Sequence, residues 1–250
     1  MVSRGLLYQV STSSALVEGV YQGAVLVGNL RKHGNLGLGT FEKLDGEMVI
    51  VDGHFYQVCS DGSVREVGDD ALSPFAVVTH FKPDLKVVMK SCPDLQSLSG
   101  QFDELRHSDN FFFALRVDGH FDSVRTRAMR PTEEGVPLVM AAAHQPEFEF
   151  HDIIGTLVGF WTPQYAKGIN VPGYHFHFLS HDRTRGGHLL ECTGDQLCLE
   201  IQREGNYRVV LPETKDFFKA DLNHDTTDAL QRAESHTPES KSWVRKIPDE

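Results

Sequence analysis

Short runs of alternating hydrophobic and polar residues, separated by turn-forming pairs, fill the first half of the chain. The clearest pattern joins Met48–Val51 to His54–Val58 through Asp52-Gly53, because an Asp-Gly pair between two apolar runs is typical of a β-hairpin. We interpret Asp61-Gly62 and Asp118-Gly119 as turns of the same kind. The strands expected in this half are Met48–Val51, His54–Val58, Phe75–Phe81, Asn110–Val117 and His120–Met129.

The alternation stops between Pro131 and Pro146, where Pro, Glu, Ala and Gln dominate and a connection between two units is expected. Strands are expected again after this connection, at Glu147–Phe160, Tyr174–Leu179, His188–Cys192 and Gln196–Gln202. Helices are expected at Asp94–His107, Lys215–Ala220 and Thr226–Glu234.

These elements indicate two β-rich units with a few helices. The N-terminal unit is expected to span residues 1–135, and the C-terminal unit residues 136–236. The segment 237–250 is charged and interrupted by proline, so we expect a mobile tail there.

Charge and composition narrow the classes of function. The formal net charge is -11, which argues against a nucleic-acid surface and favours small-molecule chemistry. The sequence has no apolar run suited to a membrane span or a signal core, so we expect a cytoplasmic protein without a membrane partner. The four cysteines are scattered and favour free thiols over a disulfide framework.

Three histidines near residue 180 are the candidates for chemistry. Alternation along a strand places His175 and His177 on one face, and Phe176 and Phe178 on the opposite, buried face. A glycine-containing turn then allows the next strand to bring His188 back toward the first pair. Such histidines can also be ordinary core or surface residues. Three neutral imidazoles with an open position nevertheless suit a catalytic divalent metal.

The sequence also resembles the α-acetolactate decarboxylase family. The resemblance extends from about Tyr8 to about Glu234, and its separate blocks occur in the order of the family. The blocks that carry it are Tyr8–Leu16, Gly37–Glu47, Gly155–Phe160, Val171–Leu179 and Gly186–His188.

The resemblance implies an α+β fold of two β-sheet-rich units, with mixed or antiparallel sheets and a few peripheral helices. It also implies an active site in the C-terminal unit and a homodimer built through the N-terminal one. It implies a cytoplasmic carboxy-lyase of the acetoin and butanediol pathway, which converts 2-acetolactate to acetoin. Loss of carbon dioxide from this β-keto acid leaves an electron pair that must spread onto the neighbouring carbonyl oxygen. A divalent metal, expected to be Zn²⁺, would stabilise the resulting enediolate. No organic cofactor is expected, because dinucleotide and phosphate loops are missing from the sequence.

Four further residues are assigned through the resemblance. Glu47 is expected to ligate the metal or to protonate the enediolate, and Thr40 to form hydrogen bonds within the same site. Arg127, rather than Arg125 two positions earlier, is expected to bind the substrate carboxylate through its bidentate fork. Glu234 matches a carboxylate that the family brings back to the metal. From sequence alone, Glu47 would be interpreted as an exposed hairpin charge and Thr40 as an ordinary strand residue. Arg127 could form a solvated surface pair with Arg125, and Glu234 would be an unremarked residue at a helix end.

Two alternatives remain open at this point. His-x-His followed by a distant histidine also begins the site of cupin-like metal-dependent oxygenases, although no Glu follows His177 closely here. A non-catalytic module that binds a metal and a small molecule is the other alternative. His181 departs from the family, which commonly has an acidic residue there. It shares the parity of His175 and His177, and we expect the turn to begin before it.

Overall fold

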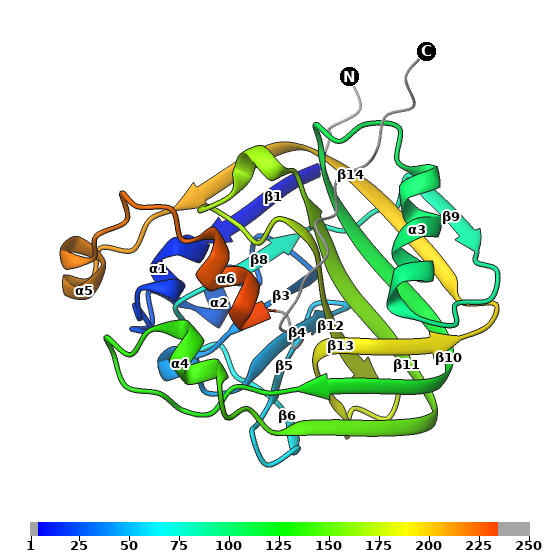
Figure 1. Ribbon diagram of the computed structural model, residues 1–250, viewed down its shortest axis with the longest axis horizontal. Coiled ribbons are helices and arrows are strands. Elements are labelled where there is room, and N and C mark those ends of the chain that lie inside the picture. The colour runs from blue at the N-terminus through cyan, green and yellow to red at the C-terminus, as the bar shows by residue number, and fades with distance from the viewer. Residues whose placement is uncertain (1–4, 235–250) are drawn as a thin grey trace.

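A computed structural model describes residues 5–234 of the protein, and the predicted tail at 237–250 lies outside them (Figure 1). The helices are α1 (Ser13–Val17), α2 (Val27–Leu30), α3 (Leu95–Leu105), α4 (Leu138–Ala142), α5 (Lys215–Lys219) and α6 (Thr227–Glu234). The first nine strands are β1 (Gly5–Val10), β2 (Val25–Leu26), β3 (Leu36–Thr40), β4 (Glu47–Val51), β5 (His54–Val58), β6 (Val64–Glu66), β7 (Leu72–Ser73), β8 (Ala76–Thr79) and β9 (Leu85–Val88). The later strands are β10 (Phe112–Arg127), β11 (Glu147–Thr162), β12 (Gly173–Ser180), β13 (Gly186–Gly194) and β14 (Cys198–Val210).

One 12-stranded sheet contains every described strand except β2 and β7, which pair with each other. Its order is β11-β12-β13-β10-β14-β1-β8-β3-β4-β5-β6, with β9 paired to β14. β1 runs parallel to β14, and the other ladders are antiparallel, so the predicted strand-rich α+β class with a mixed sheet is confirmed. The hydrogen-bonded strands cross the boundary expected near residue 135, because β1 and β10 both pair with β14. The division into two units stays a prediction.

The strands that carry the histidines form a closed ring. β10 pairs with β11, β11 with β12, β12 with β13, and β13 with β10 again. Long, bent strands make this possible, since one half of β10 pairs with β14 and the other half with β13. His188 on β13 therefore stands between His177 of β12 and Arg127 of β10 as a direct cross-strand neighbour of both.

Strand alternation directs the site residues into the space between β4 and β12, which face each other. Val49 and Val51 of β4 pack in the same core as Leu179 of β12, whereas Met48 and Ile50 pack in a separate core on the other face. Phe176 and Phe178 pack in a third core, against α3. The parity of β4 therefore places Glu47 on the face that meets β12, and the parity of β12 places His175 and His177 opposite it.

The predicted hairpins have different outcomes. Asp52-Gly53 forms the turn between β4 and β5 with φ angles of 54° and 81°, as a type I′ turn requires, so this hairpin is confirmed. The prediction of a hairpin at Asp118-Gly119 is wrong, because β10 continues as one strand through both residues. Thr156 of β11 donates a hydrogen bond to the Asp118 carboxylate at 2.6 Å. A Cβ on Gly119 would lie 2.6 Å from the Leu197 side chain, so glycine here permits close packing rather than a turn.

The three predicted helices are confirmed as α3, α5 and α6, whereas the short helices α1, α2 and α4 were not predicted. Helices α1, α4 and α6 cover the site. α3 begins after Asp94, whose carboxylate accepts a hydrogen bond from the Ser97 amide at 2.6 Å. Figure 1 shows α1, α4 and α6 gathered at one side of the sheet, and these helices contact one another. Among residues 5–234, no helix is long and apolar enough to span a bilayer.

Candidate metal centre and active site

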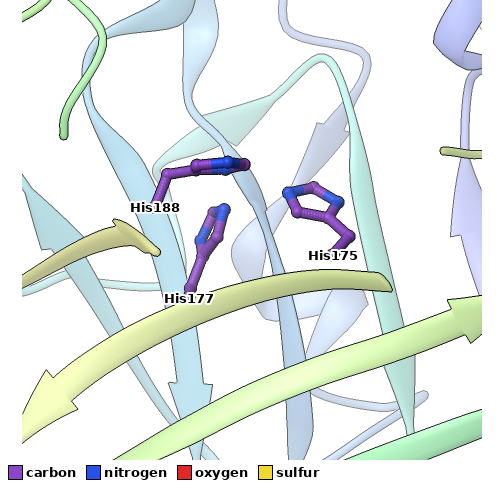
Figure 2. Close-up of side chains that lie close together, drawn as sticks. All are labelled: His175, His177 and His188. Carbon is purple, nitrogen blue, oxygen red and sulfur yellow. The ribbon is translucent and has the colours of Figure 1, made fainter. Parts of the chain in front are cut away.

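The three predicted histidines converge on one point, as Figure 2 shows. One ligand nitrogen from each of His175, His177 and His188 can be chosen so that all three lie within 4.8 Å of one another. The ring centroids are 5.0 to 5.4 Å apart. Gly187 makes this arrangement possible, because it has a φ of 134° and a Cβ there would lie 2.6 Å from the Arg127 carbonyl oxygen. The adjacent His188 thereby comes close to the other two rings.

The histidines are buried and uncharged, which suits metal binding. None of the three exposes more than 9% of its surface. Burial lowers the pKa of His175 to about 3, and it lowers the pKa of His177 and His188 well below the usual value. His177 Nδ1 lies 2.8 Å from the Met48 carbonyl oxygen, to which it must donate, so its Nε2 keeps a free lone pair. The donor set therefore fits a divalent metal with an open coordination position.

Glu47 reaches the histidines from β4. Its Oε2 lies 3.6 Å from His177 Nε2, and its Oε1 accepts a hydrogen bond from the Met129 amide at 3.0 Å. Burial raises the pKa of Glu47 to about 8, although the nearby Arg127 opposes this shift. The carboxyl group is therefore held in one orientation, with one oxygen directed at the histidines.

Glu234 reaches the histidines from the last residue of α6. Its Oε2 lies 3.4 Å from His188 Nε2 and 3.7 Å from Arg127 Nη2. Burial raises the pKa of this carboxyl group, while Arg127 acts to lower it. Arg127 Nη2 also donates a hydrogen bond to the Glu234 carbonyl oxygen at 3.0 Å, which fixes the end of the helix over the site.

Arg127 and Arg125 have different surroundings, although alternation gives them the same parity. The Arg127 side chain exposes 5% of its surface, and no group in residues 5–234 accepts a hydrogen bond from its Nε. Arg125 is 41% exposed and pairs with Glu147 at 3.1 Å. The structure therefore brings Arg127 to the histidines and leaves Arg125 at the surface.

Thr40 lies in the same cavity, but its hydroxyl group is already engaged. It donates a hydrogen bond to the Gly46 carbonyl oxygen at 2.7 Å. Gly46 directly precedes Glu47, and Thr40 is also the cross-strand partner of Glu47. Thr40 therefore stabilises the turn from which Glu47 enters the site.

All seven predicted site residues line one cavity. Its polar lining also includes Gln145, which was not predicted. Its apolar lining comes chiefly from the three covering helices and from the segments that connect strands: Leu16, Leu44, Phe75, Leu138, Ala142, Val171, Leu230 and Ala233. Gln145 stands in the irregular connection before β11, where neither alternation nor a motif marks it in the sequence.

His181 does not belong to the site. β12 ends at Ser180, and His181 is exposed in the turn that follows, as predicted. Parity alone would have included this residue. The end of the strand is therefore what separates ligand candidates from a surface histidine.

The family assignment now rests on comparison as well as geometry. A model of the alpha-acetolactate decarboxylase family matches residues 7–224. The chain belongs to the alpha-acetolactate decarboxylase family. The resemblance found in the sequence blocks is thereby confirmed, and the cupin-like alternative loses its support.

Individual members of the alpha-acetolactate decarboxylase family agree with this assignment. The enzymes of Bacillus licheniformis and Methylococcus capsulatus are 41% and 42% identical to this chain over 232 and 230 residues. These alignments cover 92% of this chain, and 92% and 88% of the two relatives. The crystal structure of alpha-acetolactate decarboxylase from Bacillus subtilis strain 168 has a TM-score of 0.89 at 38% identity. That comparison covers 92% of this chain and 99% of the other.

Proposed function

We propose that this enzyme decarboxylates 2-acetolactate to acetoin with a divalent metal held by His175, His177 and His188. One observation carries the proposal: three uncharged imidazoles, two carboxyl groups and a buried arginine line a single cavity. The printed name of the family and of its members supports the same reaction. Zn²⁺ is the proposed metal, because three imidazoles with an open position suit it.

The metal would supply Lewis-acid chemistry, which stabilises negative charge on the enediolate oxygens as carbon dioxide leaves. In this step the bond between C1 and C2 breaks, and its electron pair forms a double bond between C2 and C3. The ketone oxygen takes the negative charge. One proton must then be added at C2 to give acetoin.

Arg127 binds the substrate carboxylate in this proposal. Its guanidinium group is buried, its Nη2 is tied to the Glu234 carbonyl oxygen, and its Nε remains available within the described residues. A guanidinium group held in this way can orient a carboxylate and compensate its charge in an acidic protein.

Glu47 delivers the proton in this proposal, and Glu234 is the second carboxylate at the metal. The Met129 amide holds one oxygen of Glu47, which leaves the other oxygen facing the histidines. Addition of the proton from one side of the cavity would give a single acetoin enantiomer.

Arg127→Lys is expected to lower kcat/KM for 2-acetolactate roughly tenfold or more, because lysine keeps the charge but loses the bidentate fork. Metal content should stay unchanged. Steady-state kinetics and elemental analysis of the purified variant check both statements. Arg125→Lys is the matched control, two positions away at the surface, and should behave like the unaltered enzyme. A larger defect in Arg125→Lys than in Arg127→Lys would contradict this assignment and would indicate that Arg125 binds the substrate carboxylate.

The proposal as a whole is tested by an acetoin assay on purified protein before and after treatment with a chelator. We expect acetoin from 2-acetolactate, loss of turnover when the metal is removed, and recovery when Zn²⁺ is added. Acetoin formation that survives complete metal removal would contradict metal dependence. A protein that binds metal without forming acetoin would favour the binding module, and oxygen consumption would favour an oxygenase. The homodimer and the cytoplasmic location stay predictions.

A further inference from the structure

Gln145 carries a buried oxygen that no partner satisfies. Its Oε1 is shielded from solvent, and no donor within residues 5–234 forms a hydrogen bond to it. The residue lines the same cavity as the histidines, Glu47 and Arg127. A buried carbonyl oxygen without a donor costs free energy, so this oxygen on a residue that lines the cavity points to a donor on the substrate.

The backbone on both sides of Gln145 is fixed by the residues that follow Arg127. The Ala128 amide donates to the Pro146 carbonyl oxygen at 3.2 Å, and Arg130 Nε donates to the His144 carbonyl oxygen at 3.2 Å. Between these two contacts, the Met129 amide holds the Glu47 carboxyl group at 3.0 Å. One short segment therefore positions both Gln145 and Glu47, and Gln145 is not part of a freely moving loop.

The chemistry of the substrate leaves one partner for this oxygen. A 2-hydroxy-3-oxo acid carries a carboxylate, a ketone and a hydroxyl group at neutral pH. The carboxylate and the ketone only accept hydrogen bonds, whereas the hydroxyl group can also donate one. A carbonyl oxygen can therefore bind this substrate with a hydrogen bond only through the hydroxyl group.

We propose that Gln145 determines specificity by accepting a hydrogen bond from the C2 hydroxyl group of the substrate. This inference rests on the proposed function and adds to it a residue that selects 2-hydroxy acids over acids without the hydroxyl group. A site that is built to bond a hydroxyl group rejects ligands that lack it, because its own polar atom then stays unpaired.

The test uses two unreactive acids that differ at one position. 2-Hydroxy-2-methylpropanoate carries a hydroxyl group where 2,2-dimethylpropanoate carries a methyl group, and neither can lose carbon dioxide by this route because both lack the ketone. Calorimetry on the metal-loaded enzyme gives Kd for each acid, and the ratio of the two values measures the preference for the hydroxyl group. Gln145→Met should lower this preference about tenfold, because methionine has a similar size but no strong acceptor.

Two variants make the outcome specific. Gln145→Glu retains an oxygen acceptor and should keep the preference, whereas Gln164→Met replaces an exposed glutamine elsewhere and should change nothing. Circular dichroism and metal content confirm that each variant is folded and loaded. Gln145→Ala, which also lacks the acceptor, replaces Gln145→Met if the latter does not fold.

A preference in the acceptor-free variant within twofold of the unaltered enzyme would overturn the proposal. It would assign the hydroxyl group to Glu47, Glu234 or the metal instead. Loss of the preference in Gln145→Glu would overturn it as well, because the amide nitrogen would then be the important group. Acetoin formation by the unaltered enzyme is measured in the same preparation, so a failure of the proposed function is visible separately.

Discussion

His177→Ala is expected to remove the bound metal and to lower acetoin formation by about a thousandfold or more. The loss of Lewis-acid stabilisation is worth several kcal/mol in the transition state, and about 4 kcal/mol corresponds to this factor. The protein should stay folded, because Phe176 and Phe178 pack on the opposite face of β12 and are untouched. His175→Ala and His188→Ala should give the same result. Elemental analysis and the acetoin assay measure both effects on each variant.

His181→Ala is the control for this experiment. His181 has the same parity as the other two histidines of this segment but lies exposed beyond the end of β12. The His181→Ala variant should retain about one equivalent of metal, as expected for a single site, and full activity. If the alanine variant of one of the three histidines still holds about one equivalent of metal, that histidine is not a metal ligand.

Glu47→Gln is expected to lower turnover about a hundredfold to ten-thousandfold, the usual contribution of a positioned proton donor. Glutamine has the same size, and its oxygen can still accept the hydrogen bond from the Met129 amide. The group cannot exchange a proton, so the enediolate would be protonated slowly or from either side. Metal content and affinity for the substrate should change little.

Kinetics combined with chiral chromatography of the acetoin separate the two effects in this variant. Glu66→Gln serves as the control, because Glu66 is an exposed carboxylate on β6, two strands away from β4 in the sheet, and pairs with His54. Normal turnover with one acetoin enantiomer in Glu47→Gln would exclude Glu47 as the donor. The proton would then have to come from Glu234 or from water.

Much of the site could be predicted because strand alternation is a strong local constraint. The pattern His175-Phe176-His177-Phe178 can satisfy a buried apolar face in only one way, and the structure places both phenylalanines in the core under α3. Parity likewise explains why Glu47 meets β12, since Val49 and Val51 pack on the same face of β4. The spacing of the histidines also predicts metal binding, whereas the roles of Glu47, Arg127 and the other assigned residues came from the family resemblance.

Other features depend on contacts that a single sequence does not reveal. Asp118-Gly119 has the composition of a turn, but Thr156 of β11 and Leu197 in the connection between β13 and β14 hold it extended. Gln145 can be recognised as a site residue only from the tertiary structure, in which hydrogen bonds from the Ala128 amide and the Arg130 side chain hold its neighbours beside the cavity. In both cases tertiary packing decides between local conformations that are close in free energy.

If the three histidines hold a metal as proposed, the hydrogen bond from His177 to the Met48 carbonyl oxygen would couple metal binding to the thermodynamic stability of the fold. It joins β12 to β4, so the imidazole that presents Nε2 to a metal also crosslinks two strands that are far apart in the sequence. By linkage, free energy gained when metal binds the folded chain also opposes separation of these strands. Substitutions in the core that packs against Met48 would then weaken metal binding without changing any of the three histidines. Heat tolerance and metal affinity would evolve together.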